Sequence, residues 1–130
     1  MSDNVLRESA ITKVATVESV DMKTAAKTTL FTVPTGKVFY PFAVCIRKPS
    51  ASMAGGTDYD IGSGANADTW KQTNDLSSLT TPTTDMIFIT AGGVKYSGEV
   101  AAAAFGIKVI TGTTAACTAT IDVFGFLADA

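Results

Sequence analysis

Residues 38–47, V-F-Y-P-F-A-V-C-I-R, predict a long β-strand, because their side chains divide between two faces with the two-residue period of a strand. One face of this strand carries the even-numbered residues Val38, Tyr40, Phe42, Val44 and Ile46. The other face carries the odd-numbered residues Phe39, Pro41, Ala43, Cys45 and Arg47. We expect the even face to pack into the core. Pro41 has no N–H to donate to a neighbouring strand, so we also expect an edge or a bulge at this point.

Short runs rich in threonine, valine, isoleucine and phenylalanine predict further strands on both sides of this stretch, because β-branched and aromatic side chains pack well on a pleated surface. Seven or eight strands are expected in all. The candidates are residues 12–20, 28–33, 38–47, 58–62, 86–90, 94–100, 105–110 and 117–127.

The segments between these runs predict how the strands connect. Pro34, Thr35 and Gly36 are turn formers, and they predict a hairpin between the strands at 28–33 and 38–47. Residues 111–114 predict a second hairpin, between the last two strands. The polar stretch 63–84 predicts a long loop, with Trp70 and Leu76 as anchors in the core.

These patterns predict an all-β protein with a β-sandwich or jelly-roll-like fold, since no helical pattern of about ten residues or more interrupts the strands. The length of 130 residues favours one domain. We expect residues 1–11 to form a short N-terminal arm that lies on another surface, and residues 12–130 to form the sandwich. Val5 and Leu6 are the apolar contacts that such an arm offers.

Composition narrows the function classes. The net charge is −2 with 17% charged residues, which predicts neither nucleic acid nor a membrane surface as partner. The first residues do not read as a secretory signal, and no apolar run approaches the ~20 residues of a membrane span. The chain contains no histidine, the side chain most used in proton transfer and in metal binding. The sequence contains no recognisable set of catalytic residues, so we expect neither an enzyme nor a bound cofactor.

The two cysteines, Cys45 and Cys117, are predicted to be reduced packing residues. Cys45 lies on the odd face of its strand, whereas Cys117 shares parity with the inward residues of the last strand. Thiols on opposite faces do not reach the spacing of about 4 Å between Cβ atoms that a disulfide needs. A reduced pair fits assembly in a cytoplasm.

One segment hints at calcium. In D-Y-D-I-G-S-G-A-N-A-D, residues 58–68, the oxygen-bearing residues Asp58, Asp60, Asn66 and Asp68 all stand at even spacing. Calcium takes six or more oxygen ligands, but this stretch lacks the further ligand and the terminal Glu of an EF-hand. A strand that runs into a glycine-rich turn explains the same letters, so no metal is expected.

A weak carbohydrate signal is carried by Tyr59, Trp70 and Tyr96, whose rings would offer a stacking platform for sugars on a β-sandwich. The alternative is that a single tryptophan anchors the core or a loop.

Three blocks together resemble the small virion proteins of tailed bacteriophages. They are T-T-L-F-T-V-P-T-G-K-V-F-Y-P-F-A-V-C-I-R at 28–47, the segment at 58–68, and A-A-C-T-A-T-I-D-V-F-G-F-L at 115–127. The resemblance implies a capsid decoration (cement) protein, a homotrimer that binds the major capsid protein on the outer capsid surface after assembly in the host cytoplasm. The alternative is a fibre head or tail accessory protein with a receptor- or carbohydrate-binding role. No catalytic residue comes with the resemblance.

Three phenylalanines, Phe39, Phe124 and Phe126, lie off the expected core parity and are therefore candidates for subunit contacts. The alternative is that the long strand bends at Pro41 and that these rings lie in the core of a monomer.

Overall fold

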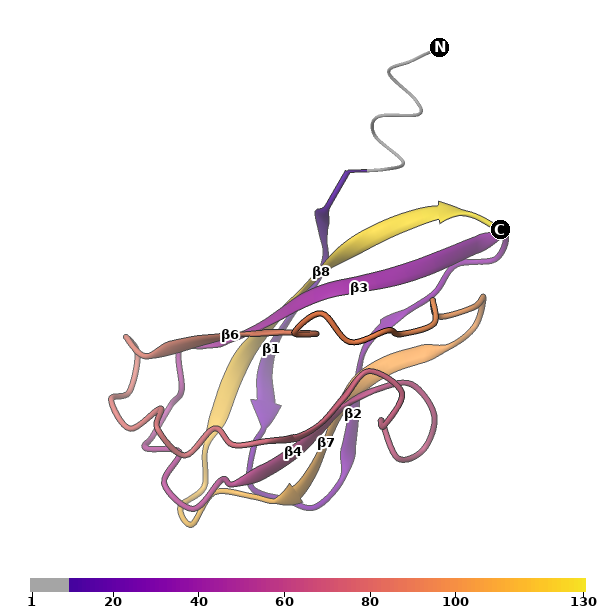
Figure 1. Ribbon diagram of the computed structural model, residues 1–130. Helices are drawn as coiled ribbons and strands as arrows, with labels where there is room; N and C mark the ends of the chain where they lie inside the picture. The colour runs from indigo at the N-terminus through magenta and orange to yellow at the C-terminus, as the bar shows by residue number, and fades with distance from the viewer. Residues whose placement is uncertain (1–9) are drawn as a thin grey trace.

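The computed structural model describes residues 10–130, so Val5 and Leu6 lie outside the described residues. Within these residues, eight strands form two antiparallel four-stranded sheets that face each other as a sandwich (Figure 1). The all-β sandwich predicted from the sequence is therefore confirmed. The strands are β1 (Thr12–Asp21), β2 (Lys27–Thr32), β3 (Lys37–Arg47), β4 (Asp58–Gly62), β5 (Lys71–Asn74), β6 (Met86–Thr90), β7 (Ala104–Thr111) and β8 (Thr118–Asp129).

The strand order defines an eight-stranded jelly roll. One sheet, here sheet A, has the order β1-β8-β3-β6, and the other, sheet B, has the order β2-β7-β4-β5. Both predicted hairpins are wrong, because β2 and β3 lie in different sheets and so do β7 and β8. Six of the seven connections between these strands cross from one sheet to the other, and the connection between β4 and β5 stays within sheet B.

The other strand predictions have mixed outcomes. The bounds predicted for β4 and β6 are confirmed, whereas residues 94–100 form no strand and contribute only an isolated bridge between Glu99 and Phe39. A turn through Gly92 and Gly93, both with positive φ, precedes this segment. The predicted long loop contains β5, which has no buried apolar residue and is held by its backbone pairing with β4.

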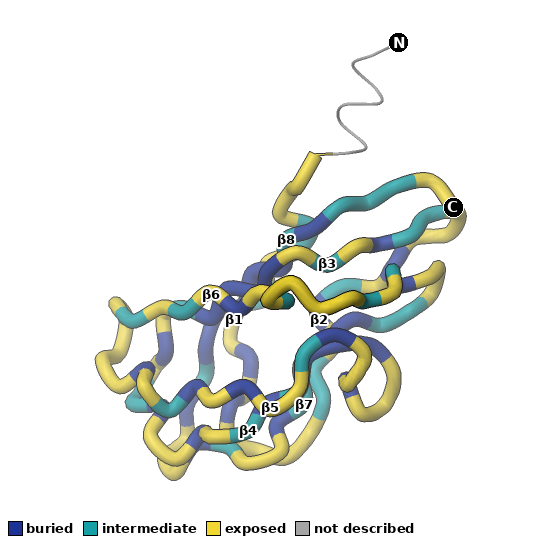
Figure 2. The backbone as a smooth tube through the Cα atoms, in the orientation of Figure 1, coloured by how far each residue is buried: buried dark blue, intermediate teal, exposed yellow. Residues whose placement is uncertain are grey.

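Aromatic side chains fill the space between the two sheets. Trp70 and Leu76 are buried, as the sequence predicts. Phe39 packs edge-on against Phe31 and Phe105, with ring centroids 5.1 Å and 5.6 Å apart. Figure 2 shows the buried positions mainly along β3, β4, β7 and β8, whereas β1 and β6 are largely exposed.

A bulge at Pro41 changes which side of β3 faces the core. The pairing with β8 shifts between Pro41 and Ala43, so one extra residue stands on β3 at this point. Before the bulge Phe39 is fully buried, and beyond it Val44 and Ile46 are. The predicted even core face is therefore wrong for Tyr40 and Phe42, which are both 47% exposed. Of the edge or bulge predicted from the proline, the structure has the bulge, since β3 lies between β8 and β6.

Candidate functional site: an aromatic face on sheet A

The outer side of sheet A carries an apolar hollow of about 260 Å³. We call its surroundings the aromatic face, because three phenylalanine rings contribute to it. Phe88 and Phe124 pack against each other with ring centroids 5.7 Å apart. The lining residues are Ile11, Phe42, Ala43, Phe88, Thr90 and Phe124.

The strand pairing explains why these side chains point outward. Cys45 lies opposite Phe88 on β6 and Asp122 on β8, and Ala43 lies opposite Phe124. All these residues alternate with core residues such as Val44, so they occupy the outer side of the sheet. Phe88 is 52% exposed. Water therefore reaches these rings, because no segment within residues 10–130 covers them.

A polar cluster lies on the same side of sheet A, around Asp122. Its carboxylate accepts hydrogen bonds from Arg47 Nε and from Thr16 Oγ1, each at 2.7 Å. Burial by itself would raise the pKa of Asp122, but these hydrogen bonds and the charge of Arg47 outweigh it, and the pKa is lowered. These hydrogen-bonded polar side chains form a border of the aromatic face.

Cys45 lies on β3, directly opposite Asp122 of this polar cluster. Burial raises the pKa of its thiol, and the neighbouring carboxylate of Asp122 raises it further. Cys45 and Cys117 are both free and buried, and Cys117 belongs to the core. The opposite facing predicted from their parity is confirmed.

The predicted subunit contacts separate into three cases. Phe124 lies on the aromatic face and stays a candidate contact. Phe39 is fully buried between the sheets, so its assignment to an interface is wrong. Phe126 is half-buried and pairs with Tyr40 on β3. Two main members of the aromatic face, Phe42 and Phe88, were not predicted as contacts. The signal for Phe42 was Pro41, since a bulge there reverses the side on which Phe42 lies.

The predicted sugar platform does not exist as a surface. Tyr59 is fully buried, and its hydroxyl donates to the Met22 carbonyl at 2.7 Å. Burial raises the pKa of Tyr59 to about 12. Trp70 is 2% exposed, and half-buried Tyr96 packs beside it with ring centroids 6.4 Å apart. These rings stabilise the core because their faces are turned away from water.

The even-spaced oxygens of residues 58–68 do not converge. Asp60 Oδ1 accepts from the Thr73 N–H at 2.9 Å, and Asn66 Oδ1 accepts from Lys108 Nζ at 3.1 Å. Within the part of the chain that the structure describes, no three His, Cys, Asp or Glu side chains gather as metal ligands would.

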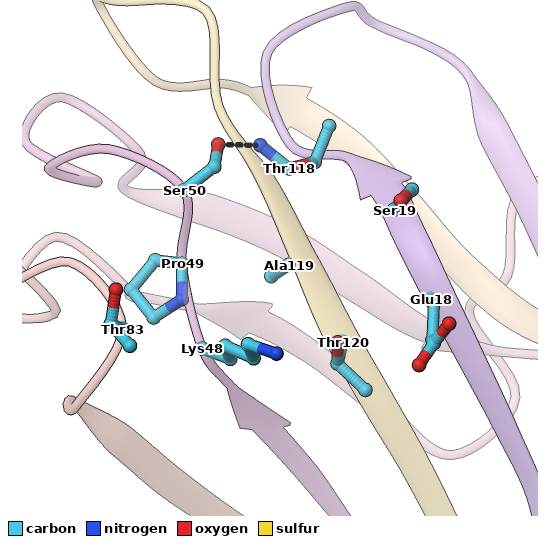
Figure 3. A pocket seen from close by; sticks show the side chains of 9 residues that line it. All are labelled: Glu18, Ser19, Lys48, Pro49, Ser50, Thr83, Thr118, Ala119 and Thr120. Carbon is cyan, nitrogen blue, oxygen red and sulfur yellow. Dashed lines mark hydrogen bonds between the residues drawn. The ribbon is translucent and has the colours of Figure 1, made fainter.

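A second, polar hollow of about 260 Å³ lies where β1, β8 and the end of β3 meet (Figure 3). Lys48 extends toward Thr120, and Glu18 lies on the neighbouring strand β1. Ser50 Oγ accepts from the Thr118 N–H at 2.8 Å. Its hydroxyl-bearing lining residues are Ser19, Ser50, Thr83, Thr118 and Thr120. Three of its lining residues, Ser19, Lys48 and Thr83, have positive φ, a strained conformation for residues with a side chain.

Comparison of the chain with models of known protein families, with curated proteins and with solved structures gave no match. Within residues 10–130, no helix reaches the length and hydrophobicity of a membrane span.

Proposed function

We propose that this protein is a structural component of a phage virion, a capsid decoration protein that binds the major capsid protein on the outer capsid surface and stabilises the shell. The observation that carries the proposal is the aromatic face, an apolar hollow that residues 10–130 leave open on the outer side of sheet A. Its function is adhesive, and the proposal includes self-association as a homotrimer.

The energetics support adhesion through this face. Phe42 and Phe88 are 47% and 52% exposed. Covering the exposed halves of the two rings removes on the order of 200 Å² from water, which is worth about 5 kcal/mol before the entropy of association is subtracted. The jelly-roll topology supports the proposal by analogy, because viral capsid proteins have this topology. The analogy concerns the fold alone, since lectins and unrelated proteins have it too.

The test compares two substitutions of similarly exposed apolar residues on opposite sheets. Phe42→Asp introduces a charge into the aromatic face, whereas Ile110→Asp changes a 42% exposed residue of β7 in sheet B. We expect wild type and Ile110→Asp to co-sediment with undecorated capsids and raise their melting temperature, and Phe42→Asp to do neither. Binding that Phe42→Asp leaves intact, or no capsid binding by wild type, contradicts the proposal. Light scattering of the free protein counts the copies.

A second candidate function is receptor or carbohydrate binding by a fibre head or tail accessory protein. The polar hollow of Figure 3 favours this function. Its hydroxyl groups, together with the ammonium group of Lys48 and the carboxylate of Glu18, suit a polyhydroxylated ligand. Screening against immobilised glycans tests this function. Lys48→Ala should abolish binding if the hollow is the site, and a wild-type protein that binds no glycan excludes it.

A further inference from the structure

One edge of sheet A has no strand beside it. β6 pairs with β3 on one side, and no strand of residues 10–130 pairs with its other side. Its sequence M-I-F-I-T contains no charged residue and no proline, two of the devices that keep an exposed edge from pairing. A hollow of about 340 Å³ runs beside it, lined by residues of β6 and by residues 71–76. The edge of β6 therefore borders open space on the side of residues 71–76.

The backbone geometry identifies which groups are available. The Lys48 N–H donates to the Asp85 carbonyl at 3.3 Å, one step beyond the last pair of the β3–β6 ladder. Backbone groups alternate in direction along an antiparallel strand. Ile87 and Ile89 therefore turn their N–H and C=O groups toward β3. The residues left with outward-facing N–H and C=O groups are Met86, Phe88 and Thr90.

We propose that two copies of this chain pair β6 against β6 about a two-fold axis through Phe88. The strand has five residues, so antiparallel pairing centred on the third keeps its full length. Phe88 then lies opposite Phe88 of the second copy, and Ile87 lies opposite Ile89 of the second copy. Met86 meets Thr90 in the same way. No like charges meet across the strands, and all three outward-facing residues find hydrogen-bonding partners.

This contact continues each sheet A into that of the second copy. Phe88 belongs to both β6 and the aromatic face, so the two aromatic faces become neighbours in one larger apolar surface. Edge pairing takes place in the plane of the sheet and leaves that surface open toward a third molecule. The inference does not depend on the capsid role, and the edge contact is separate from the three-fold contact of the proposed trimer.

The decisive test is a cysteine at the two-fold axis. In Phe88→Cys the two new thiols face each other at a hydrogen-bonded pair, where Cα atoms are about 5.5 Å apart and a disulfide can form. The matched control is Met86→Cys, on the same strand face and 56% exposed against 52% for Phe88. Its own counterpart lies about 14 Å away along the paired strands. Native Cys45 and Cys117 are 2% and 4% exposed, so they add little background.

Under mild oxidation we expect Phe88→Cys to give a covalent dimer on a non-reducing gel, with at least about tenfold less from Met86→Cys. Equal cross-linking of the two variants, or none of Phe88→Cys, overturns the proposal. The result is independent of capsid binding, so failure of this contact and failure of the proposed function are distinguishable.

Charge substitutions at the same residue give a second readout. Phe88→Lys and Phe88→Glu each place a charge opposite itself across the axis, which should weaken self-association more than about tenfold. An equimolar mixture of the two variants should restore mixed pairs. Light scattering should find an even number of copies in the wild-type assembly, namely two where only the edge contact forms and six where the edge contact joins two of the proposed trimers. Wild-type association by both single variants, or an assembly with an odd number of copies, overturns the pairing.

Discussion

Replacing Phe39 with alanine tests whether this ring belongs to the core or to a subunit interface. The side chain is fully buried and packs edge-on against Phe31 and Phe105. Truncating such a ring removes its burial and leaves a cavity, which costs about 4 kcal/mol in the free energy of unfolding. For a chain of 130 residues the unfolding entropy is about 0.27 kcal/mol per degree, so the melting temperature should fall by about 15 °C.

The assay is thermal unfolding followed by circular dichroism, run with light scattering of the native protein. Phe126→Ala is the control, because Phe126 is half-buried and its truncation should cost about 1–2 kcal/mol. The reasoning is refuted if Phe39→Ala keeps the wild-type melting temperature, or if it changes the number of associated copies while the fold stays equally stable.

Three further predictions concern sheet A. Gly125→Ala should destabilise the fold by about 1–3 kcal/mol, because a Cβ there would stand 2.4 Å from the Tyr40 carbonyl oxygen; urea unfolding measures the loss, and an unchanged midpoint contradicts it. The pKa of Asp122 is lowered by folding, so the stability it contributes should be present above pH ~4 and be lost as the pH falls through the folded pKa. Asp122→Asn leaves Arg47 without its carboxylate, so it should lower the free energy of unfolding by about 2 kcal/mol at pH 7. The variant should also lose less stability than wild type as the pH falls, and an equally steep loss in both proteins would contradict this role of Asp122. Burial raises the pKa of Cys45, so its thiol should react with a disulfide reagent at pH 8 only on unfolding, and rapid labelling of the native protein would contradict this.

Sequence patterns predicted the strands better than their partners. Short runs of β-forming residues between turn formers located β4 and β6 to the residue, because the turn formers leave little freedom in their bounds. The same signals missed β5, whose polar residues carry no alternation. Strand pairing was not predictable, since two strands joined by a short turn suit a hairpin and a crossover between sheets equally well at the level of local sequence.

Only part of the aromatic face could be predicted from the sequence, because the side on which a residue lies depends on contacts between strands. Phe124 was predicted to face outward, but Phe42 was assigned to the core because a single inserted residue reverses the parity of a strand. Proline marked the place of the bulge without showing which half of the strand keeps the predicted face. Tyr59 and Trp70 were open to two interpretations because burial of an aromatic ring depends on neighbours far away in the chain.

The central place of β8 affects how this chain folds during synthesis. β8 pairs with both β1 and β3, although it is the last of the eight strands to be translated. A nascent chain that has left the ribosome only as far as residue 117 therefore holds β1 and β3 without the strand that joins them. Closure waits for contacts between residues more than 100 positions apart, such as Thr16 and Asp122, which are slow to form. We expect a chain arrested before β8 to be sensitive to protease and to need chaperone protection until the strand emerges.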